Sequence, residues 1–274
     1  MRTVFQPLRG WLISDGRSAT QFVLAAVLFF AVDAMAETTN GLSAAEIQGC
    51  KLARELCDGQ PAESFSNAGI LQIRDDRGQR YEVPIKCKTI VTSSVWQSFY
   101  EAKLTNGAVT LIVIHAAGKP NSYYYNTNSD ERVPQLSDMP LLGRLFLGRQ
   151  VSGEELIDPF ANSDFWFADL GLEFFHWPQQ KVLKKEVRRS CGCTVLESTN
   201  PNPTTNGYSR VVSWIDNDSL GIVEAYAYDV NGKKLKYFYP KNLEKVNGQY
   251  QVQSMFMENL QTGSRTRLEF DLKK

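Results

Sequence analysis

The sequence predicts a mainly β protein, built on a curved antiparallel sheet with one apolar face. Three observations support this fold class. Short runs alternate between apolar and polar residues, turns rich in Gly and Asn separate these runs, and few segments have helical periodicity. A meander of about a dozen strands accounts for most of the chain, with short helices covering the apolar side of the sheet.

The first 36 residues read as an export signal. A basic start precedes an apolar run at residues 22–32, and Ala34-Met35-Ala36 is an A-x-A cleavage site. We expect cleavage after Ala36 and a single domain over residues 37–274. An uncleaved anchor is the alternative, but the apolar run is short for a stable membrane span.

The mature chain is expected to begin with one helix. Residues 43–46 read Ser-Ala-Ala-Glu, a capping box, and the helix should stop at Asp58-Gly59. Alternating runs then predict the first set of strands. These lie at residues 68–74, 79–91, 96–104, 109–114 and 121–126.

Residues 127–162 break the strand pattern. They carry two apolar clusters bounded by Gly, and Ser152 is placed to start a helical turn. The clusters suit either a lid over a binding groove or a satellite core under a long connection, and both interpretations stay open.

The aromatic segment at residues 163–178 is the most apolar part of the mature chain. Ser163 or Asp164 can cap a helix there, and Pro178 ends it. A helix so apolar all round is either buried core or faces a ligand. One long alternating strand is predicted from Lys181 onward. Further strands are expected at residues 208–216, 221–230, 233–240, 243–246, 250–258 and 264–272.

All five cysteines lie in the exported part and are disulfide candidates, because an oxidising compartment permits disulfides. They are Cys50, Cys57, Cys87, Cys191 and Cys193. An odd number leaves at least one thiol outside any pairing within the chain. A metal site of the C-x-C pair with Cys87 and a histidine is the alternative. We predict no metal, because His115 and His176 lie in unrelated contexts and no C-x2-C motif occurs.

The sequence gives no support for an enzyme or a cofactor. It has no nucleophile motif, no H-E-x-x-H and no phosphate-binding loop. A pair of carboxylates is the remaining catalytic alternative. His115 ends a predicted buried strand, which favours a hydrogen-bonded core histidine. Thirty basic and thirty acidic residues leave no net charge, so nucleic acid is not expected as a partner.

The sequence carries more large aromatic side chains than the core of such a sheet requires. This excess indicates a site for an apolar ligand such as a lipid tail. The residues that we expect to bind lipid are Trp96, Tyr124, Phe146, Phe165, Trp166, Phe167, Leu170, Phe174, Trp177 and Trp214. For each of them singly, core packing is the alternative role.

Several stretches resemble the outer-membrane lipoprotein-sorting proteins related to the carrier LolA. They are DPFANSDFWFADLGLEFFHW, SCGCTVLES, YSRVVSWID, YDVNGKKLKYF and SRTRLEFDL, in that order. Within the aromatic segment, Asp164, Phe165, Asp169 and Leu170 match the family's run. The resemblance implies an unclosed barrel of about eleven antiparallel strands, with helices as a lid over a hydrophobic cavity.

The same resemblance implies a periplasmic carrier that holds the acyl chains of a lipid or lipoprotein. Such a carrier would help sort lipoproteins to the outer membrane, between an inner-membrane donor and an outer-membrane acceptor protein. The alternative is a periplasmic sensor or interaction module of the same fold, which binds a protein partner.

Overall fold

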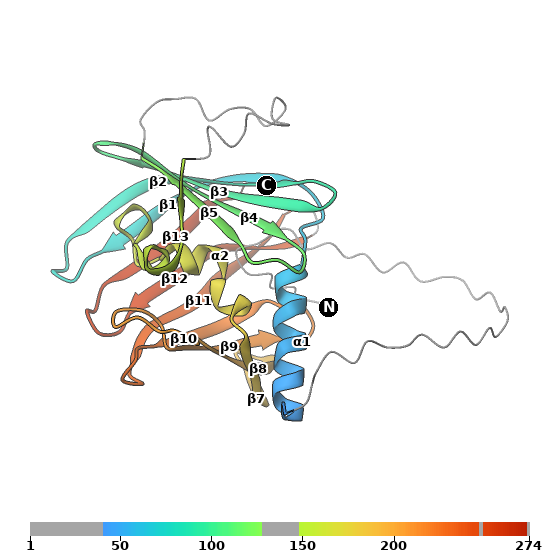
Figure 1. The fold of residues 1–274 in the computed structure, drawn as a ribbon. Coiled ribbons are helices and arrows are strands. Elements are labelled where there is room, and N and C mark those ends of the chain that lie inside the picture. Colours follow the sequence, from blue (N-terminus) through green and yellow to red (C-terminus); the bar gives the residue numbers. More distant parts are fainter. Residues whose placement is uncertain (1–40, 128–147, 247–248, 273–274) are drawn as a thin grey trace, which may run out of the picture.

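The computed structural model describes residues 41–127, 148–246 and 249–272, and within them thirteen strands form one antiparallel sheet. The strand order is β6-β5-β4-β3-β2-β1-β13-β12-β11-β10-β9-β8-β7, and the two ends do not pair with each other. The predicted fold class, a curved and unclosed antiparallel sheet with few helices, is therefore confirmed (Figure 1).

The first half of the sheet follows a single helix. The strands are β1 (Phe65–Arg74), β2 (Arg80–Val91), β3 (Val95–Leu104), β4 (Gly107–Ala116), β5 (Ser122–Asn126) and β6 (Arg149–Val151). Helix α1 (Ala44–Asp58) starts with the predicted capping box: the Glu46 amide donates to Ser43 Oγ at 3.3 Å, and the Ser43 amide donates to Glu46 Oε2 at 2.7 Å. Gly49 lets α1 approach β7, since a Cβ there would meet the Gln180 backbone at 2.5 Å.

The second half of the sheet carries the C-terminal meander. Its strands are β7 (Gln179–Arg188), β8 (Cys191–Thr199), β9 (Arg210–Asp216), β10 (Ile222–Tyr228), β11 (Lys234–Val246), β12 (Gln249–Asn259) and β13 (Arg265–Asp271). Pairing of β1 with β13 joins the two halves. At the edge of the sheet, β7 carries a bulge and several lysines, which discourage pairing with another chain.

Short helical turns connect the halves in sequence and lie between them in space (Figure 1). They are η3 (Gly153–Ile157), η4 (Phe160–Asn162), α2 (Phe167–Gly171) and η5 (Glu173–His176). We call residues 159–178 the lid segment. The single helix expected here is divided, because Leu172 adopts a left-handed conformation (φ +53°) between α2 and η5. Ser152 caps η3 as expected.

The long strand predicted from Lys181 is wrong: it is the hairpin β7–β8. Arg189 and Ser190 form the turn, with φ values of +48° and +66°. Two left-handed residues suit a tight hairpin turn, but Asn-Gly usually fills these positions, so Arg-Ser gave no turn signal. A register shift between Val182 and Lys184 also changes which side chains share a face.

The cysteine pairing expected from the export signal is not present. All five cysteines lie in the described residues, and no disulfide joins any two of them. Burial raises the pKa of the Cys193 thiol to about 11, so that thiol stays protonated at neutral pH. None of the described helices has the length and apolar content that crossing a membrane requires.

Candidate functional site: the lid segment and its anchors

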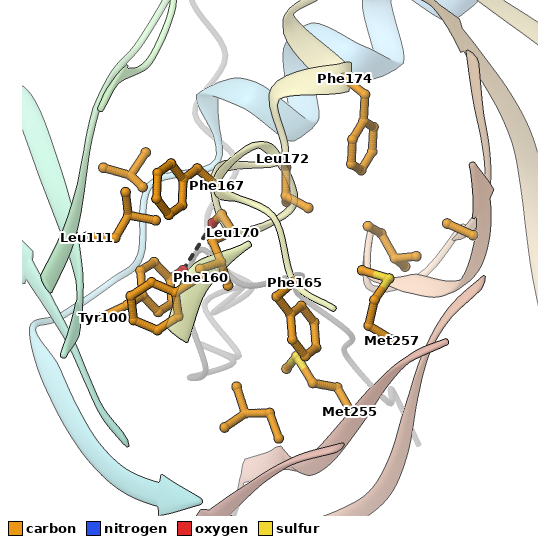
Figure 2. Packing of buried hydrophobic residues seen from close by; sticks show 14 of the residues in the cluster. Tyr100, Leu111, Phe160, Phe165, Phe167, Leu170, Leu172, Phe174, Met255 and Met257 are labelled. Carbon is orange, nitrogen blue, oxygen red and sulfur yellow. Dashed lines mark hydrogen bonds between the residues drawn. The ribbon is translucent and has the colours of Figure 1, made fainter. Parts of the chain in front are cut away.

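The lid segment fills the concave face of the sheet with apolar side chains. Phe165, Phe167, Leu170 and Phe174, four of the predicted lipid-binding residues, are each at most 5 % exposed and join the main hydrophobic core. Figure 2 shows them between two walls of the sheet. One wall carries Tyr100 and Leu111, and the other carries Met255 and Met257.

A buried ion pair ties the lid segment to the second half of the sheet. Lys236 Nζ lies 3.2 Å from Asp169 Oδ2, and the two side chains are 2 % and 6 % exposed. The Tyr208 hydroxyl donates to Asp169 Oδ1 at 2.8 Å, and the Trp166 amide donates to Asp169 Oδ2 at 2.8 Å. Asp169 on α2 is thus bonded to β11, to the segment just before β9 and to the first turn of its own helix.

Aromatic rings enclose the ammonium group of this ion pair. Lys236 Nζ lies 3.4 Å from the centroid of the Trp166 ring and 5.5 Å from that of Tyr208. The two rings stack on each other with centroids 4.6 Å apart. A cation over an indole face is stabilised by the ring quadrupole, most strongly where water is excluded.

Asp164 fixes the lid segment to β13. Its Oδ1 accepts from Ser264 Oγ at 2.5 Å and its Oδ2 from Thr266 Oγ1 at 2.8 Å. The Asp164 backbone amide donates to Thr266 Oγ1, and the Asp164 carbonyl accepts from Lys236 Nζ at 2.6 Å. We call Asp164, Asp169, Tyr208 and Lys236 the charged anchor.

Burial dominates the electrostatics of the charged anchor. It lowers the pKa of Lys236 to about 8, although Asp169 opposes the shift. Burial, followed by the nearby Asp169 carboxylate, raises the pKa of Tyr208 well above its usual value. Burial also raises the pKa of Asp164, against the hydrogen bonds from Ser264 and Thr266. The Lys236 ammonium therefore loses its proton more easily than an exposed lysine does.

A second set of hydrogen bonds, donated by uncharged side chains, holds the lid segment to the first half of the sheet. The Tyr100 hydroxyl donates to the Leu170 carbonyl at 3.1 Å, and Asn121 Nδ2 donates to the Gly171 carbonyl at 2.8 Å. The Tyr123 hydroxyl donates to Glu173 Oε2 at 2.8 Å. Gly171 is required for this contact, because a Cβ there would lie 2.0 Å from Tyr123 Oη. We call Tyr100, Asn121 and Tyr123 the neutral anchor.

His115 supports the neutral anchor as a hydrogen-bonded core histidine, as the sequence predicted. Its Nδ1 lies 2.8 Å from Asn121 Oδ1 and its Nε2 lies 3.3 Å from Ser98 Oγ. Trp96, 1 % exposed, stacks on the His115 ring with centroids 5.3 Å apart. Trp96 therefore supports the wall behind the anchor.

One small cavity lies beneath the lid segment. It has a volume of about 30 Å³ and lies between the lid segment and strands β9 to β12. Its lining includes Asp169, Phe174, Tyr208, Lys236 and Met257. Since a cavity of this size holds about one water molecule, an acyl chain fits only if lid side chains leave.

Tyr124 and Trp214 lie apart from the lid core, whereas Trp177 packs against it. Tyr124 is on the sheet face opposite its neighbours Tyr123 and Tyr125, which both contact the core. Trp177 is half-buried at the end of the lid segment, and its ring meets that of Phe174 edge to face, with centroids 6.5 Å apart. Phe146 lies outside the described residues.

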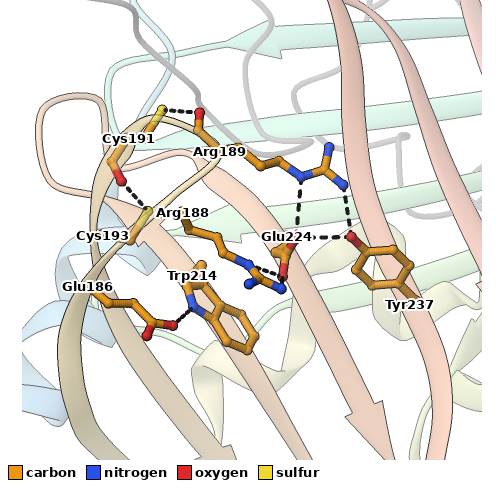
Figure 3. Close-up of polar contacts among 8 residues, drawn as sticks. All are labelled: Glu186, Arg188, Arg189, Cys191, Cys193, Trp214, Glu224 and Tyr237. Atoms are coloured by element: carbon orange, nitrogen blue, oxygen red, sulfur yellow. Dashed lines mark hydrogen bonds and ion pairs between the residues drawn. The ribbon is translucent and has the colours of Figure 1, made fainter.

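Trp214 points away from the concave face, into a polar cluster on the outer side of the sheet (Figure 3). Its Nε1 donates to Glu186 Oε1 at 2.6 Å, and the Arg188 guanidinium lies 5.4 Å from its ring. Both Arg188 and Arg189 from the β7–β8 turn pair with Glu224, whose side chain is 2 % exposed. This cluster covers a buried carboxylate and fixes the turn.

No three His, Cys, Asp or Glu side chains of the described residues come together as a cation site. Apart from Asp164 and Asp169, sequence reasoning missed the residues of the two anchors, Asn121, Tyr208 and Lys236 above all. A lysine within an alternating strand was the available signal for Lys236. The signal was ambiguous because Tyr237 and Tyr239 alternate with Lys236 along the strand. From the sequence, the face with the two tyrosines could equally have been the buried one.

This architecture, an open antiparallel sheet whose concave face is covered by short helices, is similar to that of three solved proteins. A DUF1329 family protein from Desulfovibrio piger matches with a TM-score of 0.62 and 19% identity, over 84% of this chain and 92% of that one. A putative outer membrane lipoprotein-sorting protein domain from Vibrio parahaemolyticus matches with a TM-score of 0.61 and 19% identity, over 83% and 92%.

A LolA superfamily protein from Nitrosomonas europaea matches with a TM-score of 0.53 and 14% identity, over 84% of this chain and 93% of that one. A family model described as "Uncharacterized protein" matches residues 139–273. No curated protein matches the sequence. At these identities, the likeness to solved structures establishes the fold.

Proposed function

We propose that this protein is a periplasmic carrier that binds the acyl chains of a lipid or lipoprotein beneath its lid segment. In this proposal residues 1–36 direct export, and residues 37–274 form the working domain. One observation carries it: an aromatic segment fills the concave face of an open sheet and is held there by polar anchors at two sides. The lipoprotein-sorting description of a protein with the same fold agrees with it.

Binding in this proposal exchanges lid side chains for lipid. Each buried methylene contributes roughly 0.8 kcal/mol without directional demand, so an acyl chain can replace the apolar contacts that the lid loses. Lipid shifts the equilibrium toward the form with the lid segment displaced only as far as it binds that form more tightly than the closed form. Phe165, Phe167, Leu170 and Phe174 are proposed to contact the chain, with Trp166 beside the charged anchor.

The carrier function is tested with delipidated protein and a fluorescent long-chain fatty acid. Saturable binding at micromolar concentration, displaced by an unlabelled acyl lipid, is the expected result. Organic extracts of protein purified from its native envelope should also contain acyl lipid. Protein that is lipid-free in such extracts and ignores the fatty acid would contradict the proposal.

The second candidate is a sensor or interaction module of the same fold, and the filled concave face favours it. A cavity of about 30 Å³ is what a lid with a purely structural role would leave. Crosslinking in the native envelope separates the two candidates. A stable protein partner, captured equally by lipid-free protein, would favour the module over the carrier. Neither candidate assigns a catalytic residue.

A further inference from the structure

A second hollow lies beside α1, at the end of the lid segment. It has a volume of about 280 Å³ and is bordered by α1, the turn between β4 and β5, and the end of the lid segment. We call it the helix cleft. It offers about nine times the volume of the cavity beneath the lid, and the carrier proposal does not use it.

One wall of the helix cleft is largely apolar, although it includes His176, and it is held in place. Phe175 is 3 % exposed, and Trp177 and Pro178 continue the wall. Gln180 Nε2 donates to the carbonyls of Phe174 and Trp177, at 2.9 Å and 2.8 Å. Because these bonds fix the backbone behind the rings, the wall is already formed before any ligand arrives.

The opposite rim is cationic. Arg54 comes from α1 and Lys119 from the β4–β5 turn, and both side chains are exposed. Neither forms an ion pair within the parts of the chain that the structure describes. Asp58 also lines the cleft, and its Oδ1 accepts from the amide of Gly118, another lining residue, at 2.8 Å. That bond also holds the turn against the end of α1.

We propose that the helix cleft binds a small amphiphilic anion, an acidic group carried on an apolar body. The acidic group, a carboxylate, sulfonate or phosphate, would lie between Arg54 and Lys119, where charge-assisted hydrogen bonds are stronger than neutral ones. The apolar body would lie on Trp177 and Phe175. The volume suits a compact ring system or a few methylenes rather than a whole lipid.

A matched pair of dyes tests the charge requirement. The probes are 1-anilinonaphthalene-8-sulfonate and N-phenyl-1-naphthylamine, which have the same ring body with and without the sulfonate. Arg54→Ala and Lys119→Ala should each weaken binding of the sulfonate about 2- to 5-fold, as loss of a solvent-exposed ion pair predicts. Lys51→Ala is the control, since Lys51 is an exposed cation on the same helix but outside the cleft.

Two thiols that line the cleft report where the dye binds. Cys50 and Cys57 belong to its lining, whereas Cys191 lies on the distant β7–β8 hairpin and is equally half-buried. In reduced protein, the sulfonate dye should slow alkylation of Cys50 and Cys57 by iodoacetamide and leave Cys191 unchanged, as measured by peptide mass spectrometry. The uncharged dye should protect less.

Two results would overturn this proposal. One is unchanged alkylation of Cys50 and Cys57 at saturating sulfonate dye, which would place the dye elsewhere. The other is an equal loss of affinity in Lys51→Ala and Arg54→Ala. Neither result bears on the acyl-carrier function, because the helix cleft is separate from the space beneath the lid segment.

Discussion

Lys236 Nζ lies 3.2 Å from Asp169 Oδ2, and this ion pair is almost completely buried between the lid segment and β11. Desolvating two charges is costly, and it is offset here by several further contacts. Asp169 accepts from the Tyr208 hydroxyl and the Trp166 amide, and Lys236 donates to the Asp164 carbonyl. The ion pair therefore holds the lid segment in one defined position, and its contacts are expected to break together.

Removing one partner of this pair should be strongly destabilising. Lys236→Met leaves Asp169 as a buried, uncompensated charge, which costs about 3–5 kcal/mol of unfolding free energy. The double variant Lys236→Met with Asp169→Asn should lose less than the sum of the two single variants, since no unpaired charge remains. Urea unfolding measures both. If the stability losses of the two single variants simply add up in the double variant, Lys236 and Asp169 do not act as a unit.

The stability conferred by Lys236 should depend on pH. Its folded pKa of about 8 lies below the usual value of 10.5, so between these values the unfolded chain holds a proton that the folded protein lacks. The unfolding free energy of the wild type should therefore rise with pH from about 8 to 10 relative to that of Lys236→Met. Parallel curves for the two proteins across this range would refute the assignment.

Gly171 should tolerate no side chain. In Gly171→Ala the new Cβ would lie 2.0 Å from the buried Tyr123 hydroxyl, so the lid segment must shift away from the neutral anchor. We expect a stability loss of about 1–3 kcal/mol, typical of overpacking. We also expect faster amide exchange in α2.

Gly192→Ala is the matched control for that substitution, because its nearest atom would be 3.5 Å away and its backbone needs no left-handed conformation. Thermal unfolding and amide exchange of the two variants should differ clearly. If both variants unfold and exchange like the wild type, the close approach of Gly171 to Tyr123 does not position the lid segment.

Phe174 and Trp214 should behave differently in acyl binding. Both were expected to bind lipid, but Phe174 lines the space beneath the lid, whereas Trp214 lies on the outer face against Glu186 and Arg188. Phe174→Leu should change the affinity for a fluorescent fatty acid, and Trp214→Leu should leave it unchanged. Equal effects of the two substitutions would place the acyl site elsewhere.

The general fold could be predicted from the sequence because strand alternation is a local signal. Val83, Ile85 and Cys87 are buried on one face of β2, as their spacing indicated. The capping box at Ser43 is equally local. The hairpin at Arg189 and Ser190 could not be found in this way, because the unusual turn is maintained by Glu224, a residue distant in sequence.

The site was predicted only in part. Burial of Phe165, Phe167 and Leu170 follows from their apolar density. The resemblance to lipoprotein-sorting proteins singled out Asp164 and Asp169 without giving them a role. Their partners Ser264, Thr266 and Lys236 lie far along the chain, and only the folded sheet brings them together.

The central claim is that acyl lipid displaces the lid segment from the concave face. Hydrogen–deuterium exchange, with and without a saturating long-chain fatty acid, tests it most directly. Lipid should speed exchange of amides held within the segment, such as those of Phe160 and Leu170, which donate to the Phe165 and Trp166 carbonyls. Exchange in β1, β2 and β13 should stay unchanged. Bound lipid with undiminished protection of the lid amides would contradict the claim.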